Sequence, residues 1–127
     1  MTAPLLPELT TTTFWAIINN EISDEVVNHL VWYGLGYRYD EATQQWDNTL
    51  VAPEWRDAYP EPPNFVGSRP AIVKLTRSTP KSHKQLLKEE LGFKGYKIDE
   101  LTPQRTRRAT MTNWLMSYAK LQSGEGN

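Results

Sequence analysis

The sequence has 127 residues, the length of one ordinary domain and enough to enclose a hydrophobic core. It contains no cysteine, which excludes disulfides, thiolate nucleophiles and cysteine-ligated zinc, and no apolar run that could span a bilayer. Its net charge of −1 conceals a division: residues 1–62 hold ten Asp or Glu and two Lys or Arg (net −8), and residues 63–127 hold five and twelve (net +7).

The first third of the chain predicts two helices. Residues 1–8 have the composition of a loose or draped arm, and apolar spacing predicts a helix over about 12–20. Ser23 is a suitable N-cap for a second helix, because its hydroxyl can accept a hydrogen bond from a free backbone N–H. Gly34 is expected to end that helix as a C-terminal capping residue.

The sequence pattern then changes its period. Tyr37 and Tyr39 alternate with polar residues, and Trp46 follows a "DEAT" turn, which predicts a short β-hairpin. Residues 53–63 hold four prolines and are expected to form an internal connector with one helical turn. The aromatic residues crowded here lie in an acidic segment that would repel nucleic acid, so we expect them to pack beneath the hairpin, with a subset exposed for a protein partner as the alternative.

The basic half is predicted to be mostly helical. Ser68 is expected to cap a short helix, with a strand as the alternative. Thr-Pro pairs at Thr79 and Thr102 combine an N-cap with proline at the first helical position, which predicts helices running to Leu91 and to about Leu121. Core contacts are expected in the connector between them and in the last helix, at Phe93, Tyr96, Ile98, Leu101 and Trp114. Residues 122–127 are expected to form a flexible tail.

Together these elements predict a single α+β domain, mainly α-helical, with one small β-hairpin. The segments "WYGLGYRYD", "SRPAIVKLTRSTPKSHKQLLKEELGF" and "ELTPQRTRRATMTNWLM" resemble an uncharacterised family of small cyanobacterial and plastid proteins, the domain of unknown function 1823. The resemblance covers about residues 10–120. It implies a cyanobacterial cytosol, or a plastid stroma in plant relatives, and no activity, cofactor or site. No Lys or Arg precedes Arg38, so the N-terminus lacks a secretory or transit pattern.

Motifs for catalysis or metal binding are not apparent. His29 and His83 are isolated and, without cysteine, do not make the usual zinc site. "DEATQQWDNTLV" has Gln45 and Val51 where a calcium-binding EF-hand needs Gly and Glu. No set of nucleophile, base and orienting residue is visible. We therefore expect no catalysis, no cofactor and no metal.

The positive charges of the second half are the most informative feature. On a continuous helix Lys81, Lys84 and Lys88 would form one narrow stripe. A second group lies at or just before the start of the last helix: Lys94, Lys97, Arg105, Arg107 and Arg108. A helix N-terminus disfavours cations, so these arginines either form an anion site with the free backbone N–H groups or pair with Asp99, Glu100 or the acidic half.

The leading hypothesis is a non-catalytic binding module that docks an anionic partner, RNA or DNA phosphate first, through its basic C-terminal helices. The alternative is a protein–protein adaptor or self-associating scaffold that uses oppositely charged faces. The sequence also allows a third interpretation, in which the two halves simply attract each other within one fold.

Overall fold

The computed structural model describes residues 4–124. In chain order its elements are α1 (Thr11–Ile18), α2 (Asp24–Leu35), β1 (Arg38–Asp40), β2 (Gln45–Asp47), α3 (Pro53–Ala58), α4 (Arg69–Ser78), a 3₁₀ turn (Lys81–His83), a single π-helical turn (Leu87–Leu91), a second 3₁₀ turn (Ile98–Glu100) and α5 (Pro103–Gln122). The predicted α+β class is confirmed. No helix among residues 4–124 is long and apolar enough to cross a membrane.

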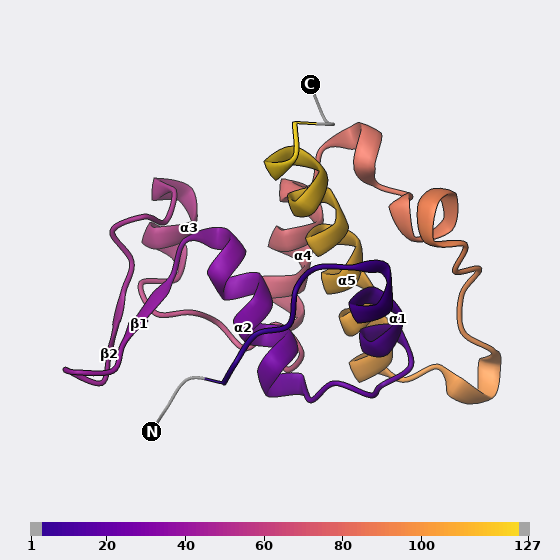
Figure 1. The fold of residues 1–127 in the computed structure, drawn as a ribbon, viewed down its shortest axis with the longest axis horizontal. Helices are drawn as coiled ribbons and strands as arrows, with labels where there is room; N and C mark the ends of the chain where they lie inside the picture. Colours follow the sequence, from indigo (N-terminus) through magenta and orange to yellow (C-terminus); the bar gives the residue numbers. More distant parts are fainter. Residues whose placement is uncertain (1–3, 125–127) are drawn as a thin grey trace.

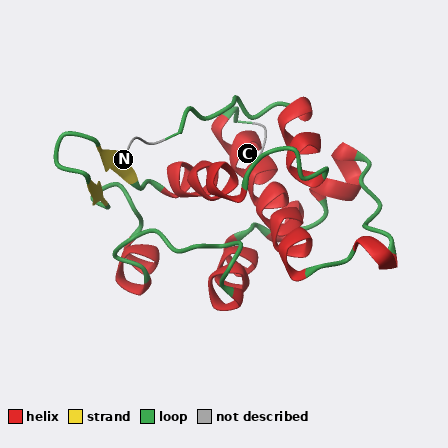
Figure 2. Cartoon of the chain, turned by 90° about the horizontal axis from the view of Figure 1, so that it is seen from below, coloured by secondary structure: helices red, strands yellow, loops and turns green. Residues whose placement is uncertain are grey.

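The long helix α5 is the centre of the molecule, and α1, α2 and α4 pack against it (Figure 1). The antiparallel hairpin pairs Arg38 with Asp47, Tyr39 with Trp46 and Asp40 with Gln45. It projects at one end of the molecule, and the connector of residues 92–102 projects at the opposite end (Figures 1 and 2). Elements from the acidic and basic halves therefore meet around α5, while the two projections stay far apart.

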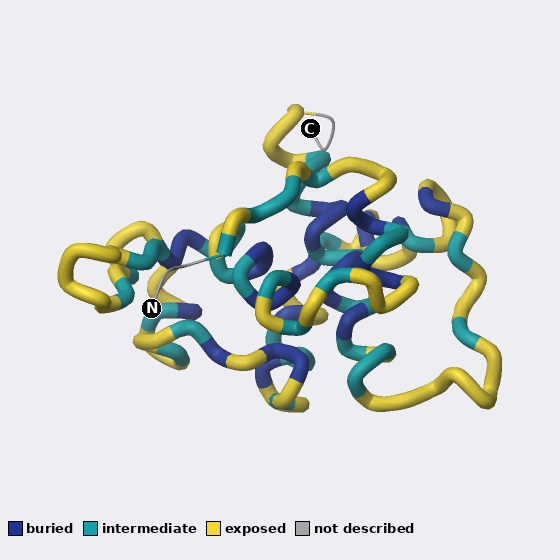
Figure 3. The backbone as a smooth tube through the Cα atoms, turned by 60° about the horizontal axis from the view of Figure 1, so that its bottom comes forward, coloured by how far each residue is buried: buried dark blue, intermediate teal, exposed yellow. Residues whose placement is uncertain are grey.

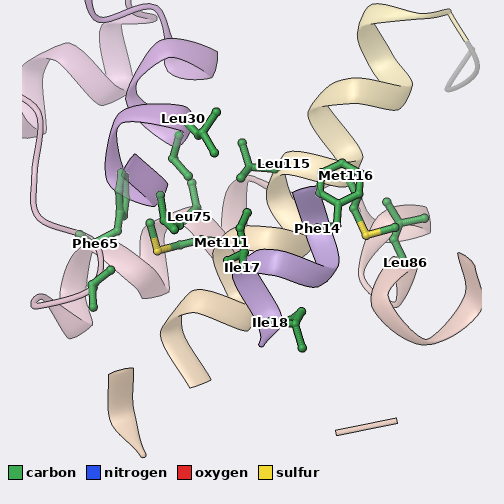
Figure 4. Packing of buried hydrophobic residues seen from close by; sticks show 14 of the residues in the cluster. Phe14, Ile17, Ile18, Leu30, Phe65, Leu75, Leu86, Met111, Leu115 and Met116 are labelled. Atoms are coloured by element: carbon green, nitrogen blue, oxygen red, sulfur yellow. The ribbon is translucent and has the colours of Figure 1, made fainter. Parts of the chain in front are cut away.

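The hydrophobic core surrounds the middle of α5. Its central members come from four helices and are fully enclosed: Ile17, Val27, Leu75, Met111 and Leu115 (Figure 4). Removing such a side chain costs about 2–5 kcal/mol, because both the buried apolar surface and the packing are lost. This shared core holds the acidic and basic halves together without needing charge attraction.

Three of the predicted helix starts are confirmed by their hydrogen bonds. The hydroxyl of Ser23 accepts from the Val26 N–H, that of Ser68 from the Ala71 N–H, and that of Thr102 from the Arg105 N–H. The segment after Ser68 is thus helix α4, not the strand considered as its alternative.

The end of α2 differs from the prediction, and so does the burial of Trp114. The capping residue is Gly36, whose φ of 111° is a left-handed conformation that suits glycine. Gly34 lies inside α2 where the helix meets α5: a Cβ built there would lie 2.7 Å from the ring of Trp114. Trp114 stacks on Tyr118, with ring centroids 5.6 Å apart, and is half-buried, so the expectation of near-complete burial was wrong.

The predicted helix from Thr79 to Leu91 is wrong. Thr79 is buried at the C-terminus of α4, where its hydroxyl donates to the Leu75 carbonyl. The chain continues as the 3₁₀ turn and the separate π-helical turn. Like charges spaced four residues apart destabilise a helix, as do cations in its first turn, and the Lys81, Lys84 and Lys88 stripe would have imposed both costs.

The connector after Gly92 confirms only half of its predicted core contacts. Phe93 and Tyr96 pack against the core, and the Tyr96 hydroxyl donates to the Ile18 carbonyl at 2.8 Å. Ile98 is 90% exposed and Leu101 is 53% exposed, so these two expectations were wrong. In Figure 3 most residues of this projecting segment are coloured as exposed.

Most aromatic residues of the acidic half are packed, as predicted, but Tyr33 is 50% exposed, which fits the alternative of an exposed subset. Trp32 and Trp46 meet edge to face with centroids 5.3 Å apart, and both pack against the core. The Trp32 indole donates to the Pro63 carbonyl at 2.6 Å, and the buried Tyr37 hydroxyl donates to the Tyr59 carbonyl at 2.6 Å. The cluster therefore anchors the proline-rich connector to α2.

Parts of the predicted flexible termini, residues 1–3 and 125–127, lie outside the described residues.

Candidate anion-binding groove

Arg108 points into the protein and serves its architecture. Its guanidinium is 1% exposed. Nη1 donates to Asp24 Oδ1 at 2.8 Å, and Nη2 donates to the backbone carbonyls of Ile17 at 3.1 Å and Ile22 at 2.5 Å. Since every one of these partners lies at the end of α1, in the following loop or at the start of α2, Arg108 locks both helices to α5. It is therefore not accessible to an external anion, contrary to the prediction for this residue.

The other two arginines of the group are also engaged within the chain. Arg107 Nη1 donates to the Val66 carbonyl at 3.0 Å. Arg105 lies 3.7 Å from Glu100 Oε2 and 5.6 Å from the centre of the Tyr96 ring. The start of α5 thus holds its arginines with acceptors and a ring from neighbouring segments, which explains why the helix tolerates cations at this end.

The division of charge is not neutralised by pairing between the two halves. Three ion pairs join residues of the described range, and only Arg108–Asp24 connects the basic half to the acidic half. The location of the remaining positive charge therefore depends on the position of each lysine in the second half.

Three of those lysines line a single hollow. A groove of about 790 Å³ lies between the C-terminal turn of α4, the irregular segment after it and one face of α5. The residues that line it are Thr76, Thr79, Lys84, Gln85, Leu87, Lys88, Phe93, Lys94, Gly95, Thr106, Ala109, Thr110 and Asn113. No carboxylate occurs among them. The surface combines three cations, four threonines and two amide side chains around an apolar floor.

The wall that carries the lysines is held by α5. Asn113 bridges it twice, because its Oδ1 accepts from the Leu87 N–H at 3.1 Å and its Nδ2 donates to the His83 carbonyl at 2.9 Å. The buried His83 ring also shares a hydrogen bond with Ser117 through Nδ1, at 2.8 Å. Side chains of α5 therefore replace the bonds that a regular helix would have made for itself.

The lysines of the groove differ in how far they are engaged. Lys84 Nζ donates to the Thr76 carbonyl. No side-chain hydrogen bond or ion pair joins the exposed Lys88 and Lys94 to another residue between 4 and 124. Lys81 and Lys97 are exposed but are not among the lining residues. The site brings together three of the eight basic residues singled out from the sequence.

Two comparisons find relatives of this protein. The model of a family described as "Domain of unknown function (DUF1823)" matches residues 8–120. The chain belongs to this family. A protein solved by solution NMR is 58% identical and has a TM-score of 0.80, with 94% of this chain and 98% of that chain covered. No curated protein matches the sequence significantly.

This DUF1823 domain also has a basic hollow that the sequence reasoning did not identify. About 670 Å³ in volume, it lies on the other side of α4 and is lined in part by Arg69, Lys74 and Arg77, with Glu54 as its carboxylate. Lys74 Nζ lies 5.0 Å above the Trp55 ring. Part of the signal was present in the sequence, because Lys74 and Arg77 are three residues apart along α4, which places these two cations on one side of the helix.

The described residues hold no group of three or more His, Asp or Glu side chains that could bind a metal ion. Three carboxylates of the hairpin region, Asp40, Glu41 and Asp47, are exposed.

Proposed function

We propose that this protein is a non-catalytic module that binds an anionic partner in the groove beside α5, with RNA or DNA phosphate as the ligand. The observation that supports this most directly is the composition of the lining, in which Lys84, Lys88 and Lys94 face no carboxylate. Lysine binds phosphate as a point charge, and hydroxyl and amide groups such as those of Thr106 and Asn113 hydrogen-bond phosphate oxygens.

Further positive charge lies outside the groove. Lys81 and Lys97 are exposed but do not line it, and the basic hollow lies on the other side of α4. Arg105 is paired but retains partial exposure, so it stays a secondary contact, whereas Arg108 is no longer part of the proposal. We place the activity in the cytosol of a cyanobacterium, or in the plastid stroma of plant relatives.

The test is the salt dependence of binding to a fluorescein-labelled oligonucleotide, measured by anisotropy from low to moderate salt. Each lysine that contacts phosphate contributes about one unit to the slope of log affinity against log salt. Lys88→Gln and Lys94→Gln should each lower the slope by about 1. Arg56→Gln, which removes the same charge on α3, is the matched control and should leave the slope unchanged.

Two outcomes would reject the nucleic-acid proposal: no salt-sensitive binding by the wild type, or an equal loss in the Arg56→Gln control. An adaptor for another protein is the second candidate, favoured by the exposure of Ile98 and Leu101 on the projecting connector. Self-association of the protein that is insensitive to salt and is lost in Ile98→Ser would support that candidate instead.

A further inference from the structure

The hairpin end of the molecule carries a pocket with different chemistry from the basic groove. A hollow of about 190 Å³ lies between the N-terminal arm, α2 and the hairpin, and it is lined mainly by rings: His29, Tyr33, Tyr37, Tyr39 and Trp46. Trp46 is 5.1 Å from Tyr39 and 5.5 Å from His29, centroid to centroid. Burial lowers the pKa of His29, more than Glu25 raises it, so its ring packs as a neutral aromatic side chain at pH 7. Pockets for drug-sized ligands measure about 300–1,000 Å³, so this hollow suits a side chain.

The chain places its own proline-rich segment on this pocket. Residues 4–7 read Pro-Leu-Leu-Pro, and Pro4 and Leu6 line the hollow while Leu5 is 97% exposed. From Pro4 onward the arm runs across α2 before it reaches α1 (Figure 1). Proline restricts its own φ and keeps the preceding residue extended, and such segments bind aromatic-lined grooves at a low cost in conformational entropy.

The same aromatic cluster also binds a second proline-rich segment. Trp32, in contact with Trp46, donates its indole hydrogen bond to the Pro63 carbonyl, and Tyr37 donates to the Tyr59 carbonyl. The cluster therefore contacts two proline-rich segments of the chain.

The two segments differ in how firmly they are held. The 59–63 segment is fixed by side-chain hydrogen bonds to its carbonyls, including one from Asn48 Nδ2 to Pro60. No hydrogen bond joins residues 4–7 to other residues in the range 4–124. The arm is held by side-chain packing alone, so an extended ligand of the same kind can replace it.

We propose that this aromatic pocket is a docking site for a proline-rich segment of another protein, which displaces the chain's own arm. The hairpin around the pocket carries Asp40, Glu41 and Asp47, so a ligand flanked by Lys or Arg is favoured by charge complementarity. Arg38 is already committed, since its guanidinium lies 3.7 Å above the Tyr33 ring and donates to the carbonyls of Tyr33 and Tyr37. This site is independent of the proposed phosphate groove.

The experiment is a peptide titration of the full-length ¹⁵N-labelled protein, followed by amide and indole NMR shifts. The probe is an acetylated Pro-Leu-Leu-Pro-Arg-Arg peptide, and the matched control is Ala-Leu-Leu-Ala-Arg-Arg, which has the same charge. The probe should shift the Trp46 indole and the amides of β1 and should saturate, whereas the control should not. A second protein, Pro4→Gly/Leu6→Ser, loosens the arm and should bind the probe about tenfold more tightly, because the competing arm no longer fills the pocket.

Equal binding of the two peptides would overturn the proposal, as would shifts that cluster away from the pocket. So would equal affinities of the wild type and the loosened-arm protein. A wild-type dimer that dissociates in Pro4→Gly/Leu6→Ser would assign the pocket to the arm of a second copy instead. The spectrum itself reports whether each variant is folded, so a misfolded variant cannot be mistaken for a negative result.

Discussion

Arg108 stabilises the fold through the position of its guanidinium and not through its charge alone. It donates hydrogen bonds to two backbone carbonyls that accept from no other described side chain. Arg108→Ala should lower the free energy of unfolding by about 2–4 kcal/mol, since it leaves the Ile22 carbonyl without its donor and opens a cavity, while the Ile17 carbonyl keeps the Asn20 N–H. Arg105→Ala is the control, and its partly exposed pair at 3.7 Å should cost about 0–1 kcal/mol. Urea denaturation measures both, and similar losses would contradict the asymmetry described for these arginines.

Tyr37 gives a pH dependence that can be measured directly. Burial, with a smaller contribution from Tyr59, raises the pKa of Tyr37 to about 12 from its usual value of 10. The folded state thus keeps a proton that the unfolded state loses, so stability contributed by this group is complete below pH 10 and is lost as the pH rises towards 12.

We expect ultraviolet titration of the folded protein to show one tyrosine ionising near pH 12. Because burial also raises the pKa of Tyr96, the comparison with Tyr37→Phe is needed to isolate the effect. The loss of stability between pH 10 and pH 12 should be smaller in that variant than in the wild type. An unchanged pH dependence would show that Tyr37 is not the responsible group.

At the scale of elements, the wall of the groove depends on Asn113. Asn113→Ala removes the bonds to Leu87 and His83 and should lower stability by about 1–2 kcal/mol. It should also weaken oligonucleotide binding by displacing Lys84 and Lys88, and the salt slope should fall by about one unit for each lysine that loses its phosphate contact. An unchanged affinity and slope would show that Asn113 does not hold these lysines in their binding positions.

Where α2 crosses α5, glycine is favoured over alanine, the opposite of the usual preference inside a helix. Alanine is about 1 kcal/mol more favourable than glycine inside an exposed helix. At Gly34 the added Cβ would meet the Trp114 ring at 2.7 Å, so Gly34→Ala should lower stability by about 1–3 kcal/mol. Adding Trp114→Phe should recover part of this loss in a double-mutant cycle. A stabilising Gly34→Ala would show that the helices separate easily.

The structural features that the sequence predicted correctly depend on residues close together in the chain. Those that it missed depend on contacts between distant segments. Ser23 and Thr102 act on backbone groups three residues away, so their capping patterns sufficed. Thr79-Pro80 has the same pattern as Thr102-Pro103 but terminates α4, because Asn113 and Ser117 supply partners for the chain beyond it. Likewise, the partners of Arg108 lie 84 to 91 residues away, so no local pattern distinguished it from an exposed cation.

The whole molecule separates its charges in space. The acidic hairpin and the connector of residues 92–102 project at opposite ends (Figure 1). The connector balances Lys94 and Lys97 with Asp99 and Glu100, so the positive charge that faces no carboxylate is that of the groove, at Lys84, Lys88 and Lys94. Exposed charges act over about 8–10 Å at ordinary salt. A binding surface therefore responds to the charges near it rather than to the net charge.

This separation predicts retention on a cation exchanger at pH 7. Lys84→Gln/Lys88→Gln/Lys94→Gln should abolish retention by removing the positive charge of the groove. Asp40→Asn/Glu41→Gln/Asp47→Asn, which changes the net charge from −1 to +2, should increase it only slightly, because those charges lie at the other end. Equal and opposite effects of the two triple variants would mean that net charge governs binding.

Arg108 also has a consequence for synthesis. The carbonyl of Ile22 is made 86 residues before the guanidinium that binds it. At about 5–20 residues per second, the ribosome needs roughly 4 to 17 s to bridge that interval. Until then α1 and α2 have no α5 to pack on, and their apolar faces are open to water. The nascent N-terminal half therefore depends on chaperones or on the ribosome surface, and stalled or truncated chains that end before α5 become substrates for proteolysis instead of folded domains.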